Sequence, residues 1–246
     1  MDKVIYTVAS GLEQIMNQQA TNSHNLANVS TFGFKAQVDS FRSVPVNGPG
    51  ADTRAFVASA TTGTDFTPGS IQQTGRPLDI AIEGKGWFAV QRRDGGEGLT
   101  RNGSFRVSDN GVLQTADGLN VLGDGGPITI PPNAVVSIGS DGTISSIDES
   151  VAGRASTPID KLKLANPDEA SLVRGVDGLF NNKDQSPTAT DITIRVVGSA
   201  LENSNVSVVS SMVNMISLAR QFDTQLMLAK KAENNNQQAA QLFRLA

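Results

Sequence analysis

The chain has 246 residues and a net charge of −4, and it contains no Cys, one His and one Trp. These counts exclude a disulfide framework, a thiolate metal site, a cysteine nucleophile and any centre that needs two His ligands, and the acidic balance argues against wholesale nucleic-acid binding. Charged residues are only 18% of the chain, below the usual share of about 25%, and 18 Asn with 14 Gln supply much of the polar surface instead.

The N-terminal segment is predicted to be a helix over residues 2–29, with a stop at residues 30–33. Apolar residues recur along one face at spacings of three and four, and amides interrupt this stripe halfway, as in a polar heptad seam. The register is Ile5, Val8, Leu12, Ile15, Gln19, Asn22, Leu26 and Val29. The segment lacks the apolar core and A-x-A cleavage site of a Sec signal peptide, which favours a cytosolic protein or one exported without cleavage.

The middle of the chain, residues 37–198, is rich in Gly, Ser, Thr and turns such as Asn102-Gly103 and Asp141-Gly142. Short apolar or alternating runs lie between these turns, at intervals typical of an antiparallel barrel or sandwich. Strands are expected at residues 78–82, 87–90, 105–107, 112–114, 128–130, 135–138, 144–147, 162–164 and 192–197. Residues 45–75 are predicted to be irregular or weakly extended, because Ser, Thr, Gly and Pro occur throughout.

A second helix of about 40 residues is predicted at the C-terminus, because neither Gly nor Pro follows Gly198. Its apolar seam is Val208, Met212, Met215, Ala219, Phe222, Leu226 and Ala229. Helices of this length usually pack along a partner helix. Two interpretations are open: a hairpin of the two terminal helices within one chain, or coiled-coil packing between chains. The narrow seam, its polar interruptions and the amide block at residues 234–238 favour packing between chains.

No segment is predicted to cross a membrane. The best candidate, residues 206–219, is shorter than the span of about 20 apolar residues that a bilayer requires, and several Ser residues and an Asn interrupt it.

Motifs for binding a nucleotide or a metal ion are weak in this chain. Gly84-Lys85-Gly86 follows an apolar run but matches neither a P-loop nor a Rossmann turn, and a tight hairpin turn is predicted there instead. Acidic turns near Asp124, Asp141 and Asp148 lack the spacing of a calcium loop. We expect no cofactor and no metal site.

No catalytic residue is predicted either. His24 has no acidic neighbour in the sequence, which is typical of a helix-surface or interface residue. Several carboxylates could pair for hydrolysis, but nothing in the sequence selects a pair. They are Asp79, Glu83, Asp94 and Glu97.

Three segments, in the order of the chain, resemble bacterial flagellar rod and hook proteins. Residues 23–35 contain an Asn-Leu-Ala-Asn stretch and then Thr-x-Gly-Phe-Lys; residues 73–88, continued at 100–105 and 110–113, resemble the central motif; residues 205–223 resemble the C-terminal motif. The motif residues are Asn25, Leu26, Ala27, Asn28, Thr31, Gly33, Phe34, Lys35, Gly75, Pro77, Leu78, Asp79, Gly84, Gly86, Trp87 and Phe88.

The resemblance implies a structural subunit of the basal-body rod that catalyses no reaction. The length and both ends are most similar to proximal-rod members, with a distal-rod paralogue as the alternative. Members are exported uncleaved by the flagellar type III apparatus and form a hollow, periplasm-spanning shaft that transmits motor torque for cell motility. Implied partners are copies of the chain, neighbouring proximal- and distal-rod proteins and the export apparatus in transit, with no nucleic acid and no membrane insertion.

The predicted fold is α+β, in which discontinuous N- and C-terminal coiled-coil helices flank an antiparallel β-rich middle resembling a barrel or sandwich. A terminal helical assembly domain comprises residues 1–36 and 200–246, an irregular connecting domain comprises 37–76 and 160–199, and a β-rich outer domain comprises 77–159. The expected assembly interface is Ile5, Val8, Leu12, Ile15, Leu26, Val208, Met212, Met215, Phe222 and Leu226.

The terminal seams are too polar to form a tight core, so we expect them to become ordered on joining the rod. Neighbouring subunits must then offset roughly 1–2 kcal/mol of conformational entropy per backbone residue. Removing about 35 residues from each end should leave the middle folded and block incorporation. Amides expected to face the lumen or neighbours are Gln18, Gln19, Asn22, Asn235 and Gln238.

Two other classes of function remain as alternatives. A hydrolase acting on peptidoglycan would need a cleft with two carboxylates about 5–10 Å apart. A soluble coiled-coil adaptor unrelated to flagella would not require the three ordered motifs.

Overall fold

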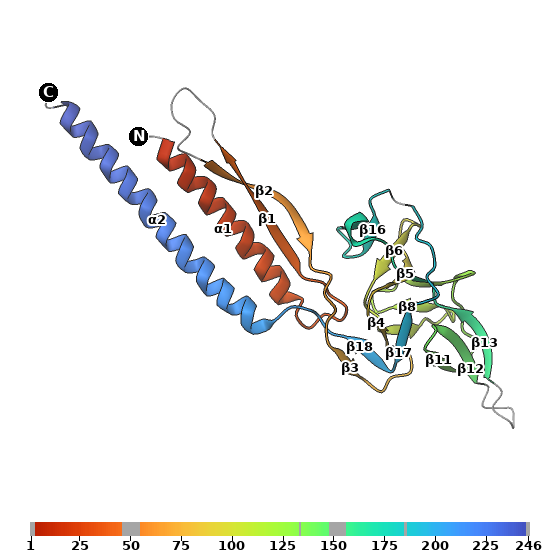
Figure 1. Cartoon of the computed structure of the whole chain (residues 1–246). Helices are drawn as coiled ribbons and strands as arrows, with labels where there is room; N and C mark the ends of the chain where they lie inside the picture. The colour runs from red at the N-terminus through yellow and green to blue at the C-terminus, as the bar shows by residue number, and fades with distance from the viewer. Residues whose placement is uncertain (1–2, 46–54, 133, 148–155, 185, 245–246) are drawn as a thin grey trace. The chain divides into compact units, whose positions relative to one another are not determined.

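The computed structural model describes residues 3–45, 55–132, 134–147, 156–184 and 186–244 (Figure 1). Contacts divide the chain into two compact units. The helical unit comprises Met1–Val29, Ala36–Asp65 and Val206–Ala246, and the β unit comprises Ser30–Lys35 and Phe66–Asn205. The division into three domains expected from the sequence stays a prediction.

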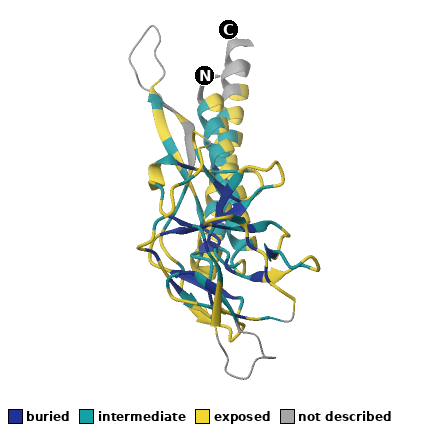
Figure 2. Cartoon of the chain, turned by 90° about the vertical axis from the view of Figure 1, so that its right-hand side faces the viewer, coloured by how far each residue is buried: buried dark blue, intermediate teal, exposed yellow. Residues whose placement is uncertain are grey.

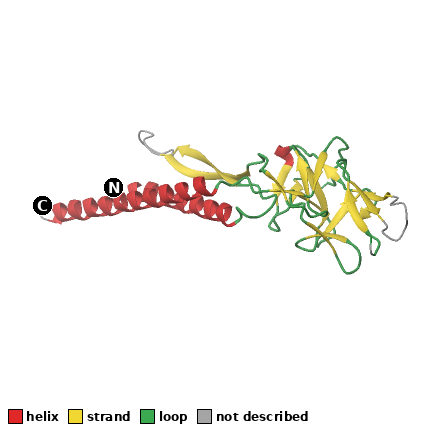
Figure 3. Cartoon of the chain, turned by 90° about the horizontal axis from the view of Figure 1, so that it is seen from below, coloured by secondary structure: helices red, strands yellow, loops and turns green. Residues whose placement is uncertain are grey.

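The helical unit is built on two long helices, α1 (Lys3–Ala27) and α2 (Val208–Arg244), which lie side by side and run antiparallel (Figures 1 and 3). The Ser207 hydroxyl accepts a hydrogen bond from the Ser210 N–H at 3.4 Å, as a helix N-cap does. Because no Gly or Pro follows Gly198, nothing interrupts the 37 residues of α2. The structure thus has the helical hairpin within one chain that was one of the two open interpretations.

Two contacts align α1 with α2. The side-chain amide of Asn22 donates to the Ser211 carbonyl oxygen at 2.8 Å, and a Cβ on Gly11 would lie 3.7 Å from the Gln225 side-chain carbon Cδ. In this register the first described residue of α1, Lys3, lies opposite about residue 233 of α2, so the last turns of α2 extend past α1 by about 16 Å (Figure 3).

The face of α2 that is least exposed differs in part from the predicted seam. Its half-buried and buried positions include Ser211, Met215, Leu218, Phe222, Gln225, Ala229 and Ala232. Met215, Phe222 and Ala229 of the predicted seam lie on this face. The other seam positions are exposed in the single chain, namely Val208, Met212, Ala219 and Leu226. The polar contact between Asn22 and Ser211 occupies the first turn of the packed face, where the heptad count places Met212.

A two-stranded antiparallel ribbon, β1 (Gln37–Pro45) and β2 (Ala55–Thr64), completes the helical unit and contacts α1. The strands pair from Gln37 opposite Thr64 to Pro45 opposite Ala55, with one register shift after Ser40. Residues 45–75 are expected from the sequence to be irregular or weakly extended; the structure instead has paired strands in this range, β2 and the short strand β3 (Ile71–Gln73). Pairing with β1 orders β2, although its Ser, Thr and Gly residues give little local signal.

The β unit contains four open antiparallel sheets among its described residues. The largest has nine strands, with the order β15-β16-β6-β5-β9-β8-β7, while β10 pairs with β9 and β14 pairs with β5. The others are β11-β12-β13, β17-β4 and β18-β3. The bounds are β4 (Ile80–Glu83), β5 (Trp87–Gln91), β6 (Glu97–Thr100), β7 (Phe105–Val107), β8 (Leu113–Thr115), β9 (Asn120–Gly123), β10 (Gly126–Pro127), β11 (Val135–Ile138), β12 (Thr143–Ile147), β13 (Ser156–Lys161), β14 (Leu164–Ala165), the short 3₁₀ helix η1 (Glu169–Ser171), β15 (Leu172–Arg174), β16 (Phe180–Asn182), β17 (Arg195–Gly198) and β18 (Ala200–Glu202).

Burial is concentrated in the β unit (Figure 2). One apolar cluster gathers around Ile80, Phe88 and Phe105, and a second gathers around Trp87 and Phe180. Among the described residues of the helical unit, only Ile15 and Ser211 are buried. The β unit therefore has cores of its own, whereas the helical unit has almost none.

The α+β class is confirmed, but the described strands form no closed barrel. The predicted strands at 105–107 and 135–138 coincide with β7 and β11. Residues 128–130 contribute one isolated bridge, Thr129 opposite Val112, rather than a full strand. Residues 84–86 do not close a hairpin, because β4 pairs with β17 while β5 pairs with β6, β9 and β14.

The described residues provide no membrane span: neither long helix combines the length and the hydropathy that a bilayer crossing needs.

Candidate assembly site

An apolar stripe on α2 is exposed in the helical unit. It consists of Val209, Met212, Val213 and Ile216, which follow the i, i+3, i+4, i+7 spacing of one helix face. Their exposed fractions are 72%, 51%, 60% and 56%. A contiguous exposed face of this kind is typical of a surface that packs against a partner.

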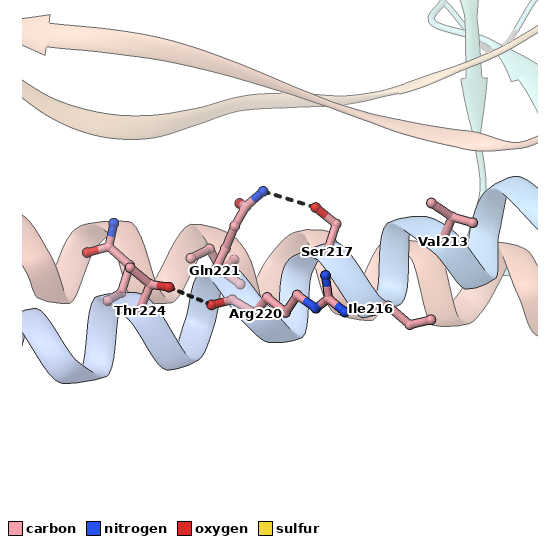
Figure 4. A pocket seen from close by; sticks show the side chains of 8 residues that line it. Val213, Ile216, Ser217, Arg220, Gln221 and Thr224 are labelled. Carbon is pink, nitrogen blue, oxygen red and sulfur yellow. Dashed lines mark hydrogen bonds between the residues drawn. The ribbon is translucent and has the colours of Figure 1, made fainter.

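A groove of about 450 Å³ lies beside the apolar stripe, between α2 and Ile15 of α1 (Figure 4). Its apolar part is formed by Ile15, Val213 and Ile216, and its polar part by Ser217, Arg220, Gln221, Thr224 and Gln225. The Gln221 side-chain amide donates to the Ser217 hydroxyl at 3.4 Å, and the Thr224 hydroxyl donates to the Arg220 carbonyl at 2.9 Å. These polar contacts are local to α2, so the groove stays open along its length.

Polar contacts join α1 to β1 and to α2. The Thr21 hydroxyl donates to Asp39 Oδ1 at 2.9 Å, while Asn25 both donates to and accepts from the Gln37 backbone at 2.8 Å. Asn22 donates to Ser211, as described above. The expectation that Asn22 faces a lumen or a neighbour is therefore corrected: its amide holds α1 to α2.

The ten predicted interface residues fall into two groups. Five on the packed side are half-buried and Ile15 is buried; the half-buried ones are Val8, Leu12, Leu26, Met215 and Phe222. The remaining four are exposed, namely Ile5, Val208, Met212 and Leu226. Sequence reasoning missed Val209, Val213 and Ile216, although apolar residues around the whole circumference of 208–216 indicate that a single seam cannot cover them all.

The motif residues of the β unit converge on a buried charge cluster, defined as Lys35, Glu202 and Arg101. Each is at most 4% exposed. Lys35 Nζ donates to Glu202 Oε1 at 2.7 Å and to the Thr67 carbonyl at 2.9 Å, and the Gly69 N–H donates to the same carboxylate oxygen at 2.9 Å. Glu202 Oε2 lies 3.1 Å from Arg101 Nε. The Glu202 carboxylate thus contacts both buried cations, Lys35 and Arg101, and its single negative charge balances the charge of one of them.

Neighbouring backbone and aromatic groups enclose the charge cluster. Arg101 donates to the Gly84 carbonyl oxygen and stands 5.9 Å from the Trp87 ring centroid. Burial lowers the pKa of Arg101, and the charge of Glu202 partly opposes that shift. Gly33 has φ of +68°, and a Cβ there would lie 2.3 Å from the Arg101 carbonyl carbon, so only Gly fits.

A second contact set links the first and central motifs through aromatic rings. The Arg174 guanidinium lies 4.6 Å from the Phe34 ring centroid and 5.0 Å from that of Phe180. Trp87 packs 4.6 Å from Phe180 and 6.0 Å from Phe66. Phe34 and Trp87, which the sequence marks as motif residues, therefore build the β unit.

Asp79 organises the turn that begins the central motif. Its carboxylate is buried, accepts from the Thr74 hydroxyl at 2.7 Å and lies 3.4 Å from Arg76 Nη1. Its role is thus to hold a turn. Among the described residues no group of three or more His, Asp or Glu side chains is placed to hold a metal ion.

The fold and these surfaces define a class of structural protein in which one long helix precedes a folded β unit along the chain and a second long helix follows it. Two family models match this chain: the flagellar hook protein FlgE/F/G D1 domain over residues 81–146, and the flagellar basal body rod FlgEFG protein C-terminal region over residues 197–242. The chain is 40% identical to the flagellar basal-body rod protein FlgF of Escherichia coli (strain K12) and to that of Salmonella typhimurium, with 100% of each chain covered. It is 30% identical to the flagellar basal-body rod protein FlgG of Bacillus subtilis, over 91% of this chain and 92% of that one.

This chain belongs to the flagellar basal-body rod protein family. It is a structural subunit of the flagellar basal body and not an enzyme, which removes the hydrolase and the unrelated adaptor as alternatives.

Proposed function

We propose that the apolar stripe and the adjoining groove are the surface through which this rod subunit packs against helices of neighbouring rod subunits. One observation carries the proposal: the helical unit has two buried residues among those described, while all four side chains of the apolar stripe are more than half exposed. Burying one such side chain fully contributes about 1.5–3 kcal/mol. Neighbouring subunits therefore supply the core that this unit lacks.

The packing we propose is a coiled-coil layer that includes both the seam within the chain and the apolar stripe. The exposed residues Val208, Met212 and Leu226 then lie on the surface between chains, and Val8, Leu12 and Phe222 belong to the seam within the chain. The groove beside Ile15 has the apolar floor and polar rim that a partner helix requires.

A second part of the proposal concerns the position of this subunit within the rod. We infer a proximal-rod position, export through the flagellar type III apparatus, assembly into a hollow shaft that transmits torque, and contact with other rod proteins. The full-length similarity to the two FlgF relatives supports the proximal-rod position. The small core of the helical unit supports export, because terminal segments with little tertiary packing unfold at low cost.

The test replaces two residues of the stripe with a charge, Val213→Glu together with Ile216→Glu. The matched control is Val173→Glu with Val176→Glu, which changes two exposed valines of the β unit. In cells that lack the native gene, the stripe variant should be absent from isolated basal bodies and should not restore motility, because a buried unpaired carboxylate opposes packing. The control should restore both.

Two further measurements separate assembly from folding and export. Emission from Trp87, the sole Trp, reports the β unit and should be the same in both variants. The amounts exported should also match. Stripe-variant subunits found in basal bodies at the wild-type level would show that this face is not the assembly surface.

A further inference from the structure

The chain passes between its two units after Val29, Lys35, Asp65 and Asn205. Within the β unit, three of the segments next to these crossings meet at the charge cluster. They are the segment at 33–35, which follows α1; the segment at 67–69, which follows the β1–β2 ribbon; and residues 202–205, which precede α2.

Direct hydrogen bonds join the segment that follows α1 to the segment that precedes α2. The Gly33 N–H donates to the Glu202 carbonyl at 2.7 Å, and the Asn205 N–H donates to the Phe34 carbonyl at 3.4 Å. Lys35 and Glu202 add the ion pair of 2.7 Å between side chains that are each 1% exposed. The Lys35–Glu202 contact spans 167 positions of the chain, and all three contacts lie wholly inside the β unit.

We propose that Lys35 and Glu202 are positioning residues for assembly, because the charge cluster brings the roots of α1 and α2 together before the two helices pair. Folding of the β unit then prepares the helical hairpin that a neighbouring subunit receives. This proposal goes beyond the assembly surface on α2, since it concerns how the helices of one chain find each other.

The size of the effect follows from the closure path. If residues 33–35 are released while β3 stays paired with β18, the path along the chain from the end of α1 at Ala27 to the start of α2 at Val208 crosses the Ile71–Glu202 pair and has about 50 residues. With Gly33 bonded to Glu202, the path is two stretches of six residues, from Ala27 to Gly33 and from Glu202 to Val208. The probability of loop closure falls as the 3/2 power of loop length, so the shorter path raises the effective concentration of one helix for the other by about 8-fold.

The experiment uses the absence of Cys in the full chain. Gly11→Cys and Gln225→Cys place one thiol on α1 and one on α2 at facing positions, since the Gln225 side chain reaches the site of a Gly11 Cβ, and the rate of disulfide formation measures how often the helices pair. This rate is compared between Lys35→Met and Lys85→Met. Lys85 forms an ion pair of 2.8 Å with Glu169, but its side chain is 75% exposed, so the control makes the same substitution outside the cluster.

We expect Lys35→Met to slow disulfide formation by about 8-fold and Lys85→Met to change it by less than 2-fold. Trp87 emission should remain native in both variants, because Glu202 keeps Arg101 and the Gly69 N–H as partners. A slowing of less than 3-fold in Lys35→Met overturns the proposal. Loss of native Trp87 emission in that variant also overturns it, since Lys35 would then act only as a core contact of the β unit.

These outcomes are independent of the assembly surface. The disulfide is measured in the isolated chain, whereas the stripe variants are scored by incorporation into basal bodies. Failure of one experiment therefore leaves the other result standing.

Discussion

Replacing Glu202 with Gln should destabilise the β unit strongly. The carboxylate oxygens of Glu202 face Lys35 Nζ at 2.7 Å, the Gly69 N–H at 2.9 Å and Arg101 Nε at 3.1 Å. A Gln side chain keeps one acceptor oxygen for Gly69 and Lys35, but its amide nitrogen then faces the Arg101 donor. Both cations also lose the one negative charge of the cluster, in a site that water does not reach.

The expected loss is about 3–5 kcal/mol, the range for removing one partner of a buried ion pair. The control is Glu169→Gln, which breaks the ion pair of 2.8 Å with Lys85 on the surface of the same unit. Exposed pairs contribute about 0–1 kcal/mol, so the control should stay close to the wild type. Comparing Glu202→Gln with Glu169→Gln therefore distinguishes the effect of losing a buried ion pair from the effect of losing an exposed one.

The assay is urea unfolding followed by the emission of Trp87, which lies beside Arg101 in the β unit. The urea midpoint of Glu202→Gln should fall while the slope m stays constant, because a change in midpoint at constant slope is a change in stability. A loss below about 1 kcal/mol would refute the view that Glu202 compensates two desolvated cations.

Three further predictions follow from the same contacts. Gly33→Ala should destabilise the β unit by about 1–3 kcal/mol in thermal unfolding, because φ is positive and the new Cβ meets the Arg101 backbone. The control Gly125→Ala, with open space around it, should change stability little. Equal losses of stability in the two variants would contradict this prediction. A fragment beginning at residue 30 should keep native Trp87 emission, but one beginning at residue 36 should lose stability because it lacks Lys35; equal urea midpoints would refute the assignment of residues 30–35 to the β unit. Backbone amides of α2 should exchange hydrogen faster than those of β5 in the isolated chain, since the helical unit has so small a core; equal protection of α2 and β5 would contradict the expected ordering on assembly.

The fragment prediction differs from the expectation drawn from the sequence. Removing about 35 residues from the N-terminus was expected to leave the β-rich middle intact, yet Lys35 belongs to the cluster in that middle. Helix periodicity ends before residue 30, and nothing in a helical pattern shows that the next six residues fold with another unit. The pairing of Lys35 with Glu202 joins positions 167 apart, and such a contact leaves no local signal.

Local pattern did predict the elements whose order is local. The apolar spacing that starts at Ile5 predicts α1, and the unbroken run after Gly198 predicts α2. Turn residues around short alternating runs placed β7 and β11 correctly. The β1–β2 ribbon was not predicted from the sequence, because pairing between the two strands and contacts with α1 stabilise it more than its amino-acid composition does.

The unequal lengths of the two helices give each subunit a direction. α1 has 25 residues and α2 has 37, and the register leaves about 16 Å of α2 beyond the first described residue of α1. One end of the helical pair is therefore a single bare helix, while the other end is two helices wide. Copies joined end to end can match a bare helix to a paired end in only one sense, so polarity along an array of such subunits is already present in one chain.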